Sequence, residues 1–348
     1  MRKVLHVLPH RGGGAETYID LLERLPGYQH LRFPLSSTRR RLAGVPSVAA
    51  RLGRARRLAA GADIVHLHGD MAAMLAARAL RGRPLVITSH GLHRLRRSTG
   101  LAGIVVRRRL AAAVAASART ICIAADEERD LRAALPPALH GRLVLVPNGV
   151  PLPDPVGEEQ RRRARAELGL GAEDVVALFV GRLEERKDPL GAIEAVERAR
   201  GAGAALIVLL AGSGPLEAAV RARQGPGVRA LGHRDDLDRL YAAADLFLLP
   251  SHREGMSFAL LEAMAHGLAP LVADGTGNRE TVGAAGFVFA PGDVAALAAR
   301  LAELAGDGER RRALGAAARE RVARELSLER FLEGTRAQYE AALAAQGA

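Results

Sequence analysis

Short apolar runs alternate with stretches of helix-forming residues along the whole chain of 348 residues. Runs that are almost continuously apolar and separated by helices indicate parallel sheets covered on both faces, so we predict an α/β protein. In the first half, the predicted strands are 4–8, 64–67, 85–88, 120–123 and 143–146. In the second half, they are 175–180, 205–210, 228–231, 246–249, 269–273 and 287–289.

The alternation is interrupted once, at residues 147–157, where the sequence PNGVPLPDPVG contains four prolines. The chain is too long for one small core, and we interpret this segment as a linker between two domains. We therefore predict doubly wound, Rossmann-like domains at 1–150 and 151–325, facing a central cleft. Their ligands are expected at the carboxyl ends of the strands.

The composition limits the classes of ligand. Aromatic residues make up only 3% of the chain and Trp is absent, which argues against a single-stranded nucleic-acid binder that stacks bases on aromatic rings. The net charge of +12, carried almost wholly by arginine, suits nucleic acid, an anionic substrate or a membrane surface. Arginine and alanine are both abundant, which coding bias also explains, so charge alone does not identify the partner.

Cys122 is the single cysteine, which excludes a disulfide within the chain and agrees with a reducing compartment. The N-terminal apolar run is short and is interrupted by His6 and Pro9, so we predict a first strand rather than a signal peptide. No apolar run reaches the length of a membrane span. We expect a cytoplasmic protein.

The segment 251–270, SHREGMSFALLEAMAHGLAP, contains two glutamates, Glu254 and Glu262. A helix is predicted to begin near Ser257, a good N-cap residue, and to end before Gly267. Glu254 would then follow the strand at 246–249, and Glu262 would lie just over one turn inside the helix. An ordinary surface helix with two solvated acids would have the same pattern.

Backbone N–H groups near Met256, Ser257 and Phe258 would form an anion site between the two carboxylates. A nucleotide sugar fits such a site, because the helix N-terminus can hold the diphosphate while each carboxylate accepts hydrogen bonds from hydroxyl groups on either side.

This segment resembles the signature of the retaining GT-B glycosyltransferases of family 4, also called group 1. The resemblance is carried by the two glutamates and by the residues around them, Gly255, Ala263, Met264, Ala265, Gly267 and Pro270. It implies that Glu254 lies beside the donor sugar and that Glu262 binds the ribose hydroxyls. It also implies that the C-terminal helix, within 326–348, crosses back to pack on the first domain.

Arg182 and Lys187 lie in the sequence VGRLEERKD, directly after the strand at 175–180. A guanidinium fork and an ammonium suit two phosphates that gain negative charge as a sugar leaves, although a solvated basic loop is the simpler interpretation. The sequence also resembles the second signature of the same family. In that family, this Arg and Lys contact the donor diphosphate.

Three contiguous glycines, Gly12 to Gly14, follow the first strand in RGGGAE. They either let backbone N–H groups approach a ligand or form a plain tight turn. The resemblance places a loop of this kind beside the donor diphosphate and the acceptor, which makes Gly13 and Gly14 candidates. His90 ends the strand at 85–88, and the resemblance implies a histidine near the 6-position of the donor sugar.

Two further motifs of the second half contain acidic residues. Asp236-Leu237-Asp238 is an Asp-x-Asp sequence, but it stands where a helix should begin, and acids are favoured there by the helix dipole. Gly277-Asn278-Arg279-Glu280 stands where relatives often have two glycines followed by Pro-Glu, so no role is assigned to Glu280. No His/Cys spacing indicates zinc. We predict that neither a metal nor a cofactor is needed.

Residues 94–109 combine six arginines with interspersed apolar residues. A basic amphipathic stretch of this kind can lie on anionic lipid at the inner face of a membrane, or it can be a normal surface helix packed on the sheet.

We therefore predict a metal-independent, retaining glycosyltransferase that moves a hexosyl unit from a nucleoside-diphosphate sugar to an unidentified hydroxyl acceptor. The predicted catalytic residues are Glu254, His90, Arg182 and Lys187. Following the family, the leaving phosphate would take the acceptor proton at the front face. A GT-B phosphorylase or epimerase, a non-catalytic nucleotide-sugar sensor, and a nucleic-acid-binding protein remain as alternatives, of which the last is suggested by charge alone.

Overall fold

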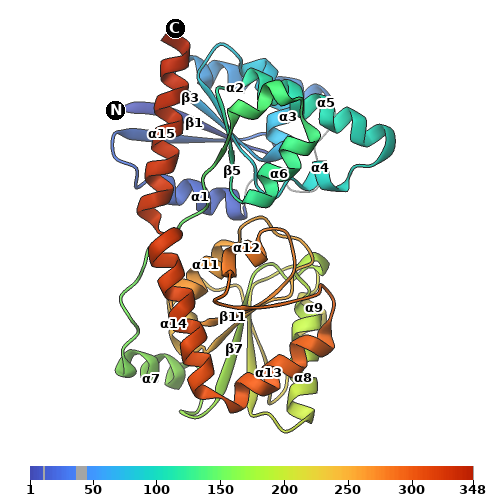
Figure 1. Ribbon diagram of the computed structural model, residues 1–348, viewed down its shortest axis with the longest axis vertical. Helices are drawn as coiled ribbons and strands as arrows, with labels where there is room; N and C mark the ends of the chain where they lie inside the picture. Colours follow the sequence, from blue (N-terminus) through green and yellow to red (C-terminus); the bar gives the residue numbers. More distant parts are fainter. Residues whose placement is uncertain (11, 37–44, 348) are drawn as a thin grey trace. The chain divides into compact units, whose positions relative to one another are not determined.

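The computed structural model describes residues 1–10, 12–36 and 45–347 (Figure 1). Arg11, at the start of the glycine motif, lies outside them. The chain forms two compact units. The first contains Met1–Gly149 together with Leu328–Ala348, and the second contains Val150–Ser327.

The first unit is a six-stranded parallel sheet in the order β2-β1-β3-β4-β5-β6. Its strands are β1 (Arg2–Leu8), β2 (Tyr28–Pro34), β3 (Ile64–His68), β4 (Leu85–Thr88), β5 (Arg119–Cys122) and β6 (Leu143–Leu145). Its helices are α1 (Gly14–Leu22), α2 (Val45–Ala60), α3 (Gly69–Leu80), α4 (His93–Arg97), α5 (Gly100–Ala116), α6 (Ala125–Ala134), η1 (Pro137–Arg142) and α15 (Leu328–Gly347).

The second unit is also a six-stranded parallel sheet, in the order β12-β11-β10-β7-β8-β9. Its strands are β7 (Val175–Val180), β8 (Leu206–Ala211), β9 (Val228–Gly232), β10 (Leu246–Leu249), β11 (Ala269–Ala273) and β12 (Phe287–Phe289). Its helices are α7 (Glu158–Glu167), η2 (Glu185–Lys187), α8 (Pro189–Gly201), α9 (Glu217–Arg221), α10 (Leu237–Ala243), α11 (Phe258–Ala265), α12 (Asn278–Val282), α13 (Val294–Gly306) and α14 (Gly308–Glu325).

The prediction of two parallel α/β sheets is confirmed, and every predicted strand is present with ends within two residues of those expected. The prediction missed β2, an edge strand of sequence YQHLRFP in which only Tyr28 and Phe33 are buried. The basic stretch 94–109 does not form one continuous helix. The chain leaves helical geometry at Ser98, which is extended with φ −96° and ψ 121°, and α5 starts only at Gly100.

Both sheets have a point where the chain order reverses. This switch point lies between β1 and β3 in the first unit and between β7 and β10 in the second. The loops after the two strands on either side of a switch point run in opposite directions. They leave a crevice at the carboxyl edge, where doubly wound sheets bind ligands.

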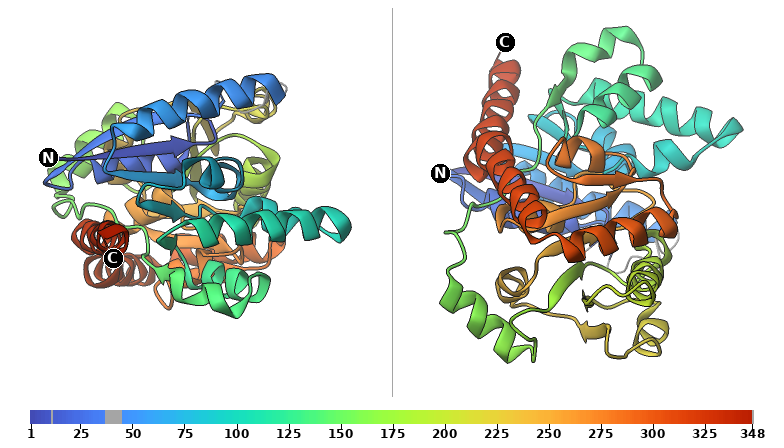
Figure 2. Two further views of the ribbon diagram at one scale, coloured as in Figure 1. Left: turned by 90° about the horizontal axis from the view of Figure 1, so that it is seen from above. Right: turned by 60° about the horizontal axis from the view of Figure 1, so that its bottom comes forward.

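In each unit helices lie on both faces of the sheet (Figure 2). In the first unit, one face packs its leucines and valines against alanines of α2, α3 and α5. The opposite face is covered by α1 and α15, and it carries buried polar side chains at His6, His66, His68 and Thr88. This polar face is unusual because buried faces of parallel sheets are normally apolar.

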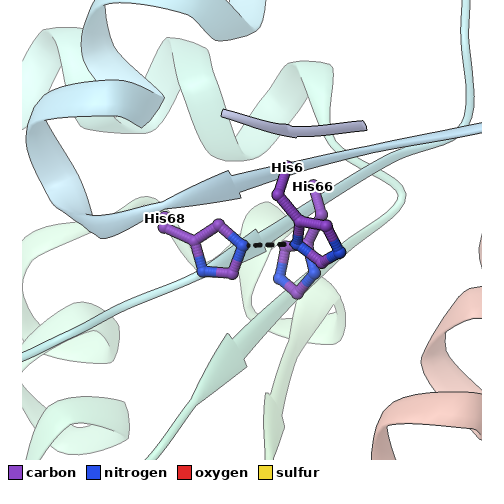
Figure 3. A group of neighbouring side chains, drawn as sticks. All are labelled: His6, His66 and His68. Atoms are coloured by element: carbon purple, nitrogen blue, oxygen red, sulfur yellow. Dashed lines mark hydrogen bonds between the residues drawn. The ribbon is translucent and has the colours of Figure 1, made fainter. Parts of the chain in front are cut away.

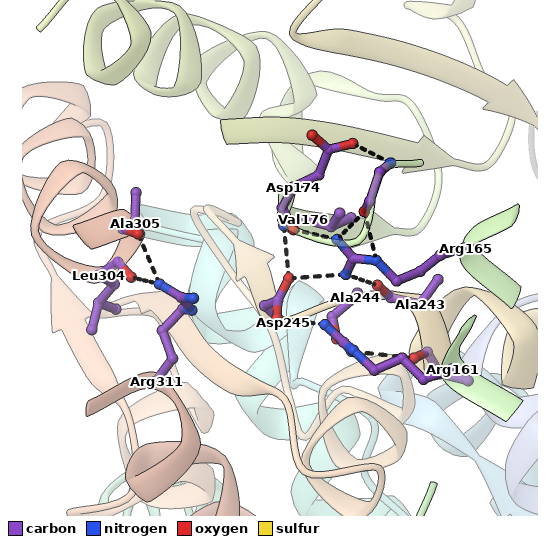
Figure 4. A network of polar contacts seen from close by, with 12 residues as sticks. Arg161, Arg165, Asp174, Val176, Ala243, Ala244, Asp245, Leu304, Ala305 and Arg311 are labelled. Atoms are coloured by element: carbon purple, nitrogen blue, oxygen red, sulfur yellow. Dashed lines mark hydrogen bonds and ion pairs between the residues drawn. The ribbon is translucent and has the colours of Figure 1, made fainter. Parts of the chain in front are cut away.

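In the second unit, an ionic network attaches α7 to the amino ends of β7 and β10 (Figure 4). Asp245 accepts from the guanidinium of Arg161 at 2.7 Å and from the Val176 N–H at 2.8 Å. Arg165 lies beside it and donates to backbone carbonyls, including that of Ala243 at 3.0 Å. These contacts stand at the amino edge of the sheet, so we assign them a structural role. Among the described residues, no helix is both long enough and apolar enough to span a bilayer.

Candidate active site

The switch point of the second unit brings together two residues predicted from separate motifs. Lys187 ends η2, in the loop after β7, and Glu254 lies in the loop after β10. The Lys187 Nζ is 2.5 Å from the Glu254 Oε1. Both side chains are largely buried, at 13% and 9% exposed. The carboxyl edge of the sheet therefore holds a close ion pair in the place where a ligand is expected.

The electrostatics of Glu254 favour its ionised form. Burial disfavours the carboxylate, but the charges of Lys187 and then Arg186 outweigh burial and hold the pKa of Glu254 below its ordinary value. Arg186 also reaches Glu254 at 3.5 Å and donates to the Arg253 carbonyl at 2.8 Å. The sequence analysis did not single out Arg186. Arg186 contacts residues that are far from it in the sequence. Within VGRLEERKD, nothing distinguishes Arg186 from the neighbouring charged residues.

Arg182 is placed differently from Lys187. Its Nε lies 3.1 Å from the Glu184 Oε2, and its side chain is 44% exposed. Arg182 does not contact Glu254 in any described hydrogen bond or ion pair, so an intramolecular contact joins only one of the two predicted basic residues to the glutamate. The Arg182 guanidinium is instead paired with Glu184 and is partly exposed to solvent.

Helix α11 begins as predicted, with Ser257 at its N-cap. The Ser257 side chain makes no capping hydrogen bond. The first intrahelical bond runs from the Leu261 N–H to the Ser257 carbonyl at 3.1 Å, so the N–H groups before Leu261 point out of the helix start. Met256, Ser257 and Phe258 are all buried. Such a start is a site at which a phosphate can be bound.

Glu262 lies one turn into α11, and the hydroxyl of Tyr241 donates to its Oε2 at 2.8 Å. Burial raises the pKa of Glu262 above its ordinary value, the hydrogen bond from Tyr241 acts in the opposite direction, and the nearby charge of Asp238 raises it further. Burial and the charge of Glu262 raise the pKa of Tyr241 well above its ordinary value, so this hydroxyl stays a donor. Sequence analysis missed Tyr241, which comes from α10.

Gly277 packs against the loop that carries Glu254. Its φ is +85°, and a Cβ added there would stand 2.0 Å from the carbonyl oxygen of Gly255. The backbone therefore requires glycine at position 277, the first residue of the Gly277-Asn278-Arg279-Glu280 motif.

The Asp236-Leu237-Asp238 motif stands at a helix start, as predicted. Asp236 is the N-cap of α10 and pairs with Arg234.

In the first unit, Gly13 is the N-cap of α1 with φ +95°, and Gly14 is the first residue of that helix. The N–H of Gly12 donates to Glu16 Oε2 at 2.7 Å, which ties the glycine turn to the first turn of the helix. Gly13 and Gly14 are both exposed. The turn thus stands at the carboxyl end of β1, next to the switch point.

His90 lies in a loop that a buried carboxylate holds in place. Glu127 of α6 accepts from the Ser89 hydroxyl, from the Gly91 N–H at 2.5 Å and from the Ile123 N–H at 3.3 Å. Its three partners flank His90 or lie on the neighbouring strand end. Sequence analysis did not identify Glu127, because one acid among several in a helix gives no sign that it is buried. Burial, and then the neighbouring His93, lower the pKa of His90 to about 3, so this imidazole is neutral.

His90 is also hydrogen-bonded to a group of buried histidines. His68 Nδ1 lies 3.0 Å from His90 Nε2, and His6 Nδ1 lies 2.8 Å from His68 Nε2 (Figure 3). His6, His66 and His68 offer ring nitrogens that all lie within 4.8 Å of one another, a grouping that could hold a metal ion. The sequence analysis found no such grouping, because the residues come from two strands that become neighbours only in the sheet.

Two family models match the chain. Residues 5–153 match the model described as Glycosyltransferase Family 4, and residues 160–321 match the one described as Glycosyl transferases group 1. Together they cover most of the chain, one on each unit.

Curated relatives are similar over much of the chain. The D-inositol 3-phosphate glycosyltransferase of Geodermatophilus obscurus is 33% identical, over 80% of this chain and 66% of the relative. A glycogen synthase of Mycobacterium tuberculosis is 30% identical, over 75% of this chain and 64% of the relative. The chain thus aligns with about two thirds or less of the length of these two proteins.

Solved structures are similar over nearly the whole chain. A sucrose-phosphate synthase from Thermosynechococcus elongatus has a TM-score of 0.81 at 22% identity, covering 99% of this chain and 100% of that one. HepE of Anabaena, solved with UDP-glucose, has a TM-score of 0.80 at 18% identity, covering 99% and 100%. At these identities the likeness shows the fold, which is the GT-B fold of two doubly wound domains.

Proposed function

The chain belongs to the glycosyltransferases of the family 4 and group 1 type, and we propose that it moves a hexosyl unit from a nucleoside-diphosphate sugar to a hydroxyl acceptor. The observation that carries the proposal is the switch point of the second unit, where the buried Lys187–Glu254 pair stands in the loops that lead to the start of α11. Similar proteins bind such donors: HepE was solved with UDP and with UDP-glucose.

The donor would be bound by groups of complementary chemistry. The N–H groups at Met256, Ser257 and Phe258 and the side chains of Arg182 and Lys187 would hold the diphosphate. Glu262 would accept hydrogen bonds from the ribose hydroxyls, with its carboxylate oriented by Tyr241. Because a phosphate would draw Lys187 toward itself, Glu254 would be released to accept hydrogen bonds from the donor sugar.

The reaction would be retaining and independent of metal. As the glycosidic bond to phosphate breaks, negative charge grows on the leaving diphosphate, and fixed positive groups stabilise that charge most in the transition state. The leaving phosphate oxygen would take the proton of the acceptor hydroxyl on the same face of the sugar. Gly13, Gly14 and His90 would serve the acceptor and the 6-position of the sugar.

The first test is the melting temperature of the purified chain with UDP, GDP, ADP, TDP or CMP, with a chelator present. A nucleotide that binds only the folded state stabilises it by about 2.7 kcal/mol at 100 times its Kd. We expect a clear increase with one nucleoside diphosphate, and we expect Glu262→Ala to abolish it. No increase with any nucleotide would contradict the proposal.

Turnover separates the remaining alternatives. Release of nucleoside diphosphate from a donor sugar in the presence of hydroxyl acceptors is expected for a transferase. Dependence on free phosphate would instead indicate a phosphorylase, and tight binding without turnover over many acceptors would indicate a sensor. Salt-sensitive binding to DNA or RNA without a nucleotide effect would favour a nucleic-acid-binding protein.

We further propose that the first unit contacts an anionic membrane from its cytoplasmic side. Helix α5 exposes Leu101, Ile104 and Val105 at 83%, 41% and 51%, and the exposed arginines 107–109 follow on the same helix. Apolar side chains flanked by arginines suit an anionic lipid surface. Flotation with anionic vesicles should retain the protein, and Leu101→Ser should weaken retention more than Leu58→Ser, a control on α2. Absence of flotation would contradict this contact.

A further inference from the structure

Four histidines of the first unit form an unbroken chain across the sheet. His30 lies on β2, His6 on β1, His68 on β3 and His90 just after β4. The His30 Nδ1 is 2.8 Å from the His6 Nε2, the His6 Nδ1 is 2.8 Å from the His68 Nε2, and the His68 Nδ1 is 3.0 Å from the His90 Nε2. Every contact joins an Nδ1 to an Nε2, so the rings are connected in the same sense throughout.

The rings of this histidine chain are neutral. His6 and His68 are fully buried, and burial followed by neighbouring histidines lowers their pKa well below the ordinary value. Burial also lowers the pKa of His30 and of His90. A neutral imidazole carries one N–H donor and one bare acceptor nitrogen. Each ring of the chain must therefore donate at one end and accept at the other.

This requirement couples the tautomers of all four rings. If His30 donates from Nδ1, then His6 accepts at Nε2 and carries its proton on Nδ1, and the same follows for His68 and His90. If His90 donates from Nε2, every ring carries its proton on Nε2 instead. A mixed arrangement would place two donors or two bare nitrogens face to face at 2.8–3.0 Å.

The His30 end of the histidine chain distinguishes the two arrangements of protons. The Nε2 of His30 is buried and has no hydrogen-bond partner among the residues that the structure describes. If every ring carries its proton on Nδ1, the Nε2 of His30 is a bare nitrogen. If every ring carries its proton on Nε2, the same atom is a buried N–H without an acceptor. Orphaned buried N–H groups are the rarer and more costly of the two.

We propose that His30, His6 and His68 are positioning residues that hold His90 as an imidazole with its proton on Nδ1. His90 Nε2 is then occupied as an acceptor, and its Nδ1–H is the donor that this ring offers at the carboxyl edge of the sheet. The benefit to catalysis rests on the proposed function: a fixed neutral donor would orient one hydroxyl of the sugar without a change of charge.

A metal ion in place of the hydrogen bonds fits these distances less well. Two histidine nitrogens on one tetrahedral zinc stand roughly 3.3 Å apart, which exceeds the 2.8 Å between His6 and His68. The third histidine of the cluster, His66, uses its nitrogens elsewhere. Its Nδ1 is 2.8 Å from the Tyr339 hydroxyl, and its Nε2 is 2.7 Å from the Thr88 hydroxyl.

The test is nitrogen NMR of the histidine rings in the full, isotope-labelled chain at pH 7, with a chelator and without ligand. Long-range proton–nitrogen correlations distinguish a protonated from a bare ring nitrogen. We expect Nδ1–H signatures for His6, His30, His68 and His90. An Nε2–H signature, or an averaged signature, at any of the four rings would overturn the proposal even if no variant folds.

Two matched variants test the coupling. In His30→Asn the amide Nδ2 can take the place of His30 Nδ1 and donate to His6, whereas the carboxylate of His30→Asp can only accept. We expect His30→Asn to leave the other three rings as Nδ1–H. We expect His30→Asp to convert His6, His68 and His90 to Nε2–H. Conversion of His6 to a neutral ring with its proton on Nε2, without conversion of His90, would overturn the proposal. Because no nucleotide is present, this outcome is independent of the donor-binding test.

Discussion

The hydroxyl of Tyr241, on α10, lies 2.8 Å from the Oε2 of Glu262, on α11, and this contact orients the carboxylate proposed to bind the ribose. Tyr241 is almost fully buried, and its ring also packs beside His266 with centroids 4.9 Å apart. The tyrosine is therefore held by packing before any ligand binds. A pre-oriented carboxylate loses less conformational entropy on binding than one that must be ordered by the ligand.

We expect Tyr241→Phe to weaken nucleotide binding about tenfold or more, because a hydrogen bond to a charged group contributes about 1.5–3 kcal/mol. The measurement is the nucleotide Kd by calorimetry. Tyr28→Phe is the control, since it removes the hydroxyl of another buried tyrosine, one that belongs to the first unit. Equal Kd values for the two variants would contradict the role of Tyr241.

Glu262 should give the protein an unusual pH dependence of stability. Its pKa is raised in the folded state, so ionisation costs more folded than unfolded. The wild-type protein is then most stabilised by this group below the ordinary pKa of glutamate and loses that stabilisation as pH rises through the folded pKa. We expect Glu262→Gln to gain stability over wild type at pH 7.5 and to lose this advantage near pH 4, in urea unfolding. An advantage independent of pH would contradict the raised pKa.

The Lys187–Glu254 pair should matter far more to stability than the Arg182–Glu184 pair. In Lys187→Met the 3.5 Å contact with Arg186 is the ion pair left to the buried carboxylate among the described residues, and removing one partner of a buried pair costs about 3–5 kcal/mol. Arg182→Met breaks a partly exposed pair, which contributes about 1 kcal/mol or less. Urea unfolding of the two variants measures the difference. Similar losses would show that Glu254 is not dependent on Lys187.

The contribution of Glu254 to folding stability has the opposite pH dependence to that of Glu262. The pKa of Glu254 is lowered in the folded state, so its contribution is present above the ordinary pKa of glutamate and is lost as pH falls through the folded pKa. In Lys187→Met the folded-state pKa of Glu254 should rise toward or above its unfolded value, so this acid-induced loss should shrink or disappear. An unchanged acid limb of the unfolding curve would contradict the assignment.

Local patterns were sufficient to predict most of the fold. The strands at 85–88, 175–180, 246–249, 269–273 and 287–289 are found with the expected ends, because each is a buried apolar run between helices. The edge strand β2 was missed because it pairs with a neighbour on one side only and because polar residues interrupt its apolar residues. The start of α11 at Phe258 agrees with the predicted N-cap at Ser257, although the Ser257 side chain makes no capping hydrogen bond.

The partners of the site residues could not be predicted in the same way. Tyr241, Glu127 and Arg186 act on residues in other elements, and nothing in their own neighbourhood of the sequence distinguishes them from other tyrosines and charges. The histidine chain is a similar case. His6 and His68 were visible in the sequence, but the register of β1 and β3 decides that they meet.

The last prediction concerns Gly277, whose backbone contact fixes the loop that carries Glu254. Gly277→Ala adds two costs: the positive φ of +85°, about 1–2 kcal/mol for an L residue, and a Cβ only 2.0 Å from the Gly255 carbonyl oxygen. Gly27→Ala adds only the first cost, because Gly27 has φ +90° and open space where a Cβ would stand.

We expect Gly27→Ala to lose about 1–2 kcal/mol of unfolding free energy, and Gly277→Ala to lose at least about 1–3 kcal/mol more, as for an overpacked site. Relief of the clash requires a shift between position 277 and Gly255, and Gly255 lies between Glu254 and Met256. Gly277→Ala should therefore also reduce the increase in melting temperature with nucleotide, whereas Gly27→Ala should leave it unchanged. Equal stability losses with an intact nucleotide effect would mean that the loop carrying Glu254 does not depend on this contact for its position.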